Sequence, residues 1–184
     1  MMTHEAMAEA FGDDWVMRMP PATAKRYVSS EADRRVLTEV GLPKMFTDIL
    51  VFGDYATDEP RTVGSIFSTV TEERAKLGND LVIASGMGGL TCLSGDDGRV
   101  YWYNPGDTKR NGALINSTLD HFAATLHQVW VLLADLHPAD ESDVGRMLRA
   151  LVPEVGAIDP PAFESPVKYW QLLMLFSLRS FVSP

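Results

Sequence analysis

A glycine-rich stretch with an adjoining serine is the first candidate for chemistry, because such turns can hold phosphates and an exposed serine can act as a nucleophile. Gly86, Gly88 and Gly89 are not followed by Lys and Ser or Thr, and their spacing does not fit a dinucleotide-binding turn. Ser85 lacks the glycine two positions earlier that a nucleophile elbow needs, because residue 83 is Ile. We interpret the cluster as a turn in which glycine allows close backbone packing.

The histidines and the single cysteine offer no metal-binding pattern. His4, His121, His127 and His137 form no His-Glu-x-x-His motif and no i, i+4 pair. Cys92 cannot form an internal disulfide or a cysteine-based zinc site, and its setting in an apolar run predicts a buried side chain. We predict neither a metal nor another cofactor.

Carboxylates and tyrosines gather around two predicted turns and one predicted strand. Paired carboxylates can do acid–base chemistry, but turns favour Asp for local backbone hydrogen bonds, so an acidic rim facing a partner is the functional alternative. In a strand from Arg99 to Tyr103, one face carries Tyr101 and Tyr103, and the other carries Val100 and Trp102. Aromatics beside acidic loops are typical of an interface hot spot, and core packing is the alternative. The candidate partner-binding residues are Asp54, Asp58, Glu59, Asp96, Asp97, Tyr101 and Tyr103.

The chain is acidic, with 16 Lys and Arg against 25 Asp and Glu and a formal net charge of -9. Such a surface disfavours nucleic acid and anionic lipid and favours a basic partner, while simple solubility is the other explanation. The 184 residues predict one domain, 1–184, and the composition is that of a globular protein. The sequence does not decide the oligomeric state.

The first residues lack the basic and apolar segments of a secretory signal. The most apolar stretch, residues 170–176, is too short to span a bilayer. Together with the lone cysteine, these features predict a soluble protein of the reducing cytoplasm.

The first half of the chain predicts a helix followed by short strands. Residues 1–12 form a short helix or a loose start, and 15–21 an extended lead-in. Ser30 to Val40 forms a helix that Ser30 caps and Gly41 ends. The predicted strands are residues 45–52, 63–70 (a strand or a sheet edge), 81–84, 90–93 and 99–103, with turns at 86–89 and 95–98.

The second half predicts helices. A short extended piece, 111–115, leads to Ser117-Thr118-Leu119-Asp120, which has the form of a capping box. Apolar residues spaced three and four apart from 119 to 133 predict a long helix. Further helices are expected at 140–151, ended by Pro153, and at 169–182, with a chain break at Pro160-Pro161. Grouped strands and helices favour an α+β fold with an antiparallel or mixed sheet between N-terminal and C-terminal helices.

The order of several segments resembles the SUKH superfamily, in particular its fourth family. Gly41-Leu42-Pro43 follows the first clear helix, and Leu93-Ser94-Gly95-Asp96-Asp97-Gly98-Arg99-Val100-Tyr101 follows the strand-rich middle. Ile115-Asn116-Ser117-Thr118-Leu119-Asp120-His121-Phe122 then opens the long helix. Asp159-Pro160-Pro161-Ala162-Phe163 and Tyr169-Trp170 are similar to the family's C-terminal end. One departure is Thr118, where the family more often has serine.

The resemblance implies an α+β fold and an immunity protein of a bacterial polymorphic toxin system. Such a protein binds a toxin domain, such as a basic nuclease or deaminase, and blocks it without catalysis. The resembling segments are mainly structural, so they assign no toxin-binding residue. Two alternatives stay open: a regulatory or scaffold binding module of the cell's own pathways, and an enzyme, which would need a pocket of convergent polar groups.

Overall fold

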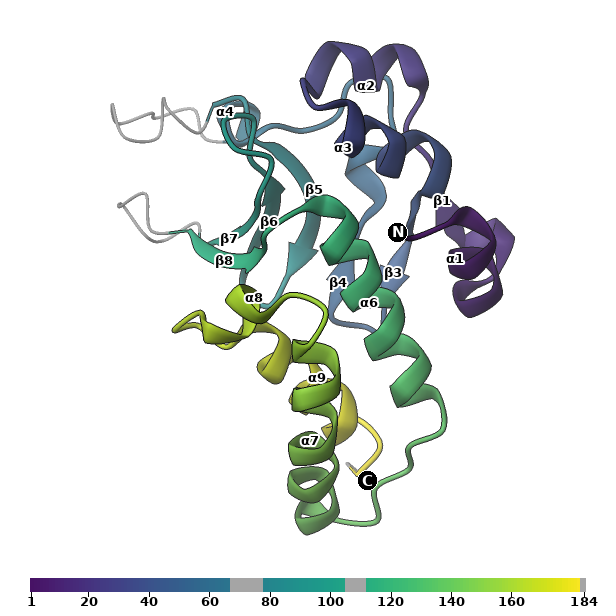
Figure 1. Ribbon diagram of the computed structural model, residues 1–184, viewed down its shortest axis with the longest axis vertical. Coiled ribbons are helices and arrows are strands. Elements are labelled where there is room, and N and C mark those ends of the chain that lie inside the picture. Colours follow the sequence, from purple (N-terminus) through teal and green to yellow (C-terminus); the bar gives the residue numbers. More distant parts are fainter. Residues whose placement is uncertain (67–77, 105–111, 183–184) are drawn as a thin grey trace.

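The computed structural model describes residues 1–66, 78–104 and 112–182 (Figure 1). Within these ranges short helices come first, strands follow in the middle, and helices return at the C-terminus. The predicted α+β class, with N-terminal and C-terminal helices around a sheet, is confirmed.

The central sheet is a meander in which each strand pairs with the next along the chain. Every pairing is antiparallel, which decides between the two sheet types that the sequence left open. A separate two-stranded sheet joins β1 (Val16–Met17) to β2 (Leu42–Pro43). The strands of the central sheet are β3 (Met45–Phe46), β4 (Leu50–Val51), β5 (Leu81–Gly86), β6 (Gly89–Leu93), β7 (Val100–Tyr103) and β8 (Ala113–Asn116).

The predicted turn between β5 and β6 is present, and its glycines are needed. Gly88 has a φ of +73°, which residues with a side chain rarely adopt. A Cβ on Gly86 would lie 1.9 Å from the Ile49 carbonyl oxygen, and one on Gly89 would lie 2.4 Å from the Trp102 indole nitrogen. Close packing, not phosphate binding, accounts for these glycines.

Two strand predictions are wrong. Residues 45–52 do not form one strand but the β3–β4 hairpin, whose turn places Thr47 at a φ of +48°. The segment predicted as a strand or sheet edge at 63–70 begins instead with the helical turn α4 (Val63–Ile66), and residues 67–70 lie outside the described residues. The Thr62 and Ser65 side chains each accept a hydrogen bond from the other's backbone N–H, a capping arrangement that overrides the local β propensity.

The N-terminal segment is more regular than its sequence predicts. A helix, α1 (His4–Phe11), replaces the alternative of a loose start, and Thr3 caps it. The expected extended lead-in at 15–21 contains only β1, because α2 (Pro21–Tyr27) begins at Pro21, a favoured first helical residue. A short 3₁₀ turn, η1 (Asp13–Trp15), precedes β1.

The helix predicted from Ser30 to Val40 is confirmed in extent but not in uniformity. It begins as α3 (Glu31–Arg35), with the Ser30 hydroxyl accepting the Asp33 N–H at 3.3 Å, as the sequence predicts. It widens into the π-helical segment η2 (Val36–Val40), closed by the Gly41 N–H donating to the Val36 carbonyl at 2.8 Å. Gly41 ends the helix at a φ of +82°.

The long helix α6 (Leu119–Ala134) crosses one face of the sheet (Figure 1). The helices that follow are α7 (Glu141–Gly156), α8 (Pro160–Glu164) and α9 (Tyr169–Arg179). Pro153 does not end α7 as predicted but lies in its last turn, and the helix continues to Gly156 without the one hydrogen bond that an N–H at residue 153 would make. After a break at Asp159, Pro160 and Pro161 begin α8.

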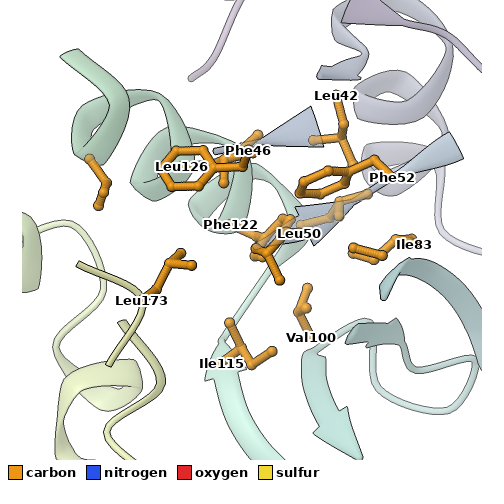
Figure 2. Close-up of a cluster of buried hydrophobic side chains, with 14 of the residues drawn as sticks. Leu42, Phe46, Leu50, Phe52, Ile83, Val100, Ile115, Phe122, Leu126 and Leu173 are labelled. Carbon is orange, nitrogen blue, oxygen red and sulfur yellow. The ribbon is translucent and has the colours of Figure 1, made fainter. Parts of the chain in front are cut away.

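The main core lies between the sheet and α6. Phe46, Leu50 and Ile115 on the strands face Phe122 and Leu126 of α6, and all five are fully buried (Figure 2). Leu173 brings α9 into the same core. On the opposite face of the sheet a smaller cluster contains Val63, Val82, Leu90 and Cys92, and Ile66 and Tyr103 pack against it.

A buried polar network joins the sheet to the C-terminal helices. The Asp159 carboxylate accepts hydrogen bonds from the Ser117 N–H at 2.6 Å, the Ser117 hydroxyl at 2.9 Å and the Asn116 amide at 3.1 Å. The side-chain oxygen of Asn116 accepts the Trp170 indole N–H at 3.1 Å. Asn116 and Asp159 are almost inaccessible to solvent, so these hydrogen bonds fix β8, α8 and α9 relative to one another.

Candidate partner-binding surface

The outer face of the sheet, opposite α6, carries a continuous row of paired residues. Met45 pairs with Val51, Val51 with Ser85, Ser85 with Leu90, and Leu90 with Tyr103. Because side chains alternate between the faces of a strand, the row lies on one side of the sheet. Met45 and Val51 are exposed and Tyr103 is half-buried, so the row leads from an open apolar edge to the tyrosines of β7.

Tyr101 and Tyr103 lie side by side on this face, as the strand pattern predicts. Their ring centroids are 6.2 Å apart. On the other face Val100 is fully buried and Trp102 packs against the main core. The Tyr103 hydroxyl donates to the Asp80 carboxylate at 3.1 Å. Burial, together with the nearby Asp80 charge, raises the pKa of Tyr103 and keeps it a neutral donor.

The acidic turn between β6 and β7 is part of the same surface. As the sequence predicts, Asp96-Asp97-Gly98 joins two adjacent antiparallel strands. The Tyr101 hydroxyl donates to the Asp97 carboxylate at 2.8 Å, and the Arg99 N–H donates to it at 3.1 Å. Partial desolvation opposes ionisation of Asp97, but these hydrogen bonds outweigh it and hold its pKa below the ordinary value. The turn therefore carries a fixed negative charge.

The candidate residues Asp54, Asp58 and Glu59 belong to a different segment. Asp54 lies within the short turn η3 (Gly53–Tyr55), and Asp58 and Glu59 follow it as exposed residues. The Asp58 carbonyl accepts a hydrogen bond from Arg26 of α2 at 2.7 Å. The structure therefore gathers Asp96, Asp97, Tyr101 and Tyr103, which we call the β7 surface, and places the other acidic residues on a loop beside α2.

Sequence reasoning did not identify an acidic groove that borders the β7 surface. It has a volume of about 420 Å³ and is lined by the β6–β7 turn and by the N-terminal ends of α3 and α6. Asp33 lines it and is nearly buried; desolvation raises its pKa, against hydrogen bonds from Ser30 and from the Leu119 N–H. Asp120 also lines the groove, but its carboxylate forms an ion pair with the Arg35 guanidinium, with an N–O distance of 2.7 Å. Only the position of Asp33 in the first helical turn was visible in the sequence.

The described residues provide no metal centre. Among them, no three His, Cys, Asp or Glu side chains lie close enough together to hold an ion. Cys92 is buried as predicted, and burial raises the pKa of its thiol. None of the described helices has the length and apolar character needed to cross a bilayer.

A comparison with family models identifies the family of this chain. The model of the SUKH-4 immunity protein family matches residues 2–175. The chain belongs to the SUKH-4 immunity protein family. Comparison with curated proteins gives no significant match, and comparison with solved structures gives none either. The family resemblance of the sequence is thus confirmed over nearly the whole chain, and this SUKH-4 protein has the α+β fold that the resemblance implies.

Proposed function

We propose that this protein neutralises a toxin domain of a bacterial polymorphic toxin system by binding it directly and blocking it sterically, without catalysis. The observation that carries the proposal is the match to an immunity protein family over residues 2–175. An immunity protein of this kind acts in the cytoplasm of the cell that makes it. It needs neither a cofactor nor nucleic acid nor a membrane for this role.

The β7 surface is the proposed centre of toxin contact. Tyrosine side chains bury a large area at low conformational cost and still offer a hydroxyl, so they are frequent hot-spot residues. Here Tyr101 and Tyr103 lie beside the charged turn of Asp96 and Asp97, and a groove containing Asp33 adjoins them. This combination suits a toxin that presents Arg or Lys beside apolar side chains, as a nuclease or deaminase with a basic substrate-binding face does.

The acidic loop beside α2 is the proposed outer rim of the interface. Asp58 and Glu59 are exposed and add to a net charge of -9. Exposed charges at a rim contribute little to affinity but speed the encounter of oppositely charged partners. We therefore assign Asp58 and Glu59 to steering the toxin rather than to holding it, and keep Asp54, which precedes them in the chain, as a candidate contact.

The test of this function begins with the gene neighbourhood, where we expect a gene with a C-terminal toxin domain, and continues with co-expression of that toxin. Growth should be rescued, and the two proteins should co-purify. The double variant Asp97→Asn, Tyr101→Ala should weaken the complex by at least about a hundredfold, because both changes remove central contacts. Glu9→Gln, an exposed acidic position on α1, is the control with unchanged affinity.

Three outcomes would count against the proposal. Failure of rescue and of co-purification rejects the pairing with that toxin. Recovery of only housekeeping proteins in a pull-down favours a regulatory module of the cell's own pathways. Unchanged affinity in a double variant that unfolds at the same denaturant concentration as the parent rejects the β7 surface as the site.

A further inference from the structure

An apolar groove that contains no residue of the β7 surface lies between the β3–β4 turn and the last turns of α6 and α9. It has a volume of about 500 Å³, within the usual range of binding pockets. Phe176 and Phe181, which line it, are 46% and 51% exposed. Two half-exposed phenylalanines in one hollow are unfavourable in water and are typical of an interaction site.

One wall of this groove is held rigidly. Trp130 of α6 lines the groove, and its indole N–H donates to the Ala10 carbonyl at 2.7 Å. Its ring packs against Phe11 and Phe46, with centroids 4.8 Å and 5.7 Å away. The indole is therefore fixed by α1 and the sheet, and an incoming side chain meets a preformed surface.

The groove also contains a buried polar group without a partner. Ser177 of α9 lines the groove with only 1% of its surface exposed. Its hydroxyl forms no hydrogen bond with any described residue. A buried unpaired hydroxyl is unfavourable, because it has lost its hydrogen bonds to water and gained none in the protein. A donor or acceptor from a bound molecule would remove this cost, so the observation points to an occupant.

The rim of the groove is electronegative. Asp48 lies exposed on the β3–β4 turn and forms no ion pair with the residues that the structure describes. The C-terminal ends of α6 and α9 border the groove and add the negative ends of two helix dipoles. Arg179, the basic residue of the last turn of α9, is held by Glu141 at 3.2 Å.

We propose that this groove binds a basic amphipathic helix of the partner protein. Apolar side chains one helical turn apart would enter between Phe176 and Phe181, and a Lys or Arg beside them would face Asp48. A helix suits the apolar walls because it satisfies its own backbone hydrogen bonds, and a polar side chain beside its apolar ones would supply the partner that the Ser177 hydroxyl lacks. The proposal rests on the proposed function only in assigning this helix to the toxin.

The experiment measures binding of synthetic helices to the full chain. The probe is a Leu/Lys amphipathic peptide of about four helical turns. A Leu/Glu peptide and a Leu/Lys peptide of shuffled order are the peptide controls. Titrations are followed by amide chemical shifts, which locate the site. The Leu/Lys helix should shift residues 47–49, 130–134 and 176–182, and the two control peptides should not.

Variants of the chain separate the contributions to this binding. Phe176→Ser combined with Phe181→Ser should weaken the Leu/Lys helix by about tenfold or more, and Asp48→Asn by about threefold. Trp15→Ser removes an exposed aromatic side chain that does not line the groove, and should leave affinity unchanged. Both phenylalanines are exposed, so these variants should fold normally.

The proposal is overturned if the Leu/Lys helix does not bind, if the groove variants bind it as the parent does, or if the Leu/Glu helix binds equally well. A self-association of the chain that the phenylalanine variants abolish, without peptide binding, would assign the groove to a second copy and also overturn it. Rescue of growth from the toxin is a separate measurement. Loss of rescue with intact peptide binding therefore counts against the proposed function alone.

Discussion

Asp97 in the β6–β7 turn and Asp33, which faces that turn, have pKa values shifted in opposite directions because their surroundings differ. Asp97 is exposed and receives hydrogen bonds from the Arg99 N–H and the Tyr101 hydroxyl, so its pKa is lowered. Asp33 is nearly buried, and desolvation raises its pKa in spite of its own hydrogen bonds. The sequence shows Asp33 as an acid in the first turn of a predicted helix and Asp97 as an acid in a predicted hairpin turn. It does not show how much water each retains, because only the folded chain determines that.

The raised pKa of Asp33 predicts a pH-dependent effect of Asp33→Asn. At about pH 3 the carboxyl is neutral in the folded and unfolded chain, so no charge is buried. Because the pKa is raised in the folded chain, the folded state binds the proton more tightly than the unfolded state, which stabilises the fold at low pH. As the pH rises through the folded pKa, the carboxyl loses its proton in both states and this stabilisation is lost. The variant should therefore gain stability relative to the parent between about pH 3 and pH 7.

Urea unfolding at both pH values measures this difference. Asp58→Asn, at an exposed position, is the control and should show a much smaller change. A difference between Asp33→Asn and the parent that is the same at both pH values contradicts the account.

The start of α6 shows how tertiary contacts select among local signals. Sequence reasoning places a capping box on Ser117 and Asp120, but Ser117 gives both its N–H and its hydroxyl to Asp159. Asp120 pairs with Arg35. The cap therefore moves one residue on, and the Thr118 hydroxyl accepts the His121 N–H at 3.1 Å. Periodicity predicted the helix, but its first residue depends on partners distant in sequence.

Thr118→Ala should lower the free energy of unfolding by about 1 kcal/mol, because it leaves an amide of the first turn of α6 without its acceptor. Thr118→Ser keeps the hydroxyl and should unfold close to the parent in guanidinium. Equal losses in both variants would indicate that the threonine methyl group, rather than the cap, stabilises this end of the helix.

At the scale of the molecule, local patterns predicted one kind of surface and could not predict the other. The acidic turn and the tyrosines of the β7 surface lie within eight residues, 96–103, so the alternation of one strand places them together. Asp33 joins them only through the packing of α3 against α6. The apolar groove combines residues 47–49, 130–134 and 176–181, and no periodicity connects these segments.

The Asp159 network predicts how firmly the C-terminal helices are attached to the sheet. Asp159→Ala removes the acceptor of three hydrogen bonds in a buried site and should lower the free energy of unfolding by about 3 kcal/mol. Amide exchange in α8 and α9 should accelerate more than in β5 and β6. Ser117→Ala, which removes one of these bonds, should cost about 1 kcal/mol. Equal effects of the two variants contradict a shared network.

The contacts between the N-terminal segment and α6 also bear on how the chain is made. The Ala10 carbonyl is bonded to Trp130, and Arg35 is paired with Asp120, across 120 and 85 residues of sequence. At about 5–20 residues per second, a ribosome finishes the first helices several seconds before α6 exists to receive them. During this time the apolar side of α1 has no α6 to pack against. We therefore expect the nascent protein to bind chaperones until α6 emerges. The protein should therefore reach its folded state only when most of the chain has been translated.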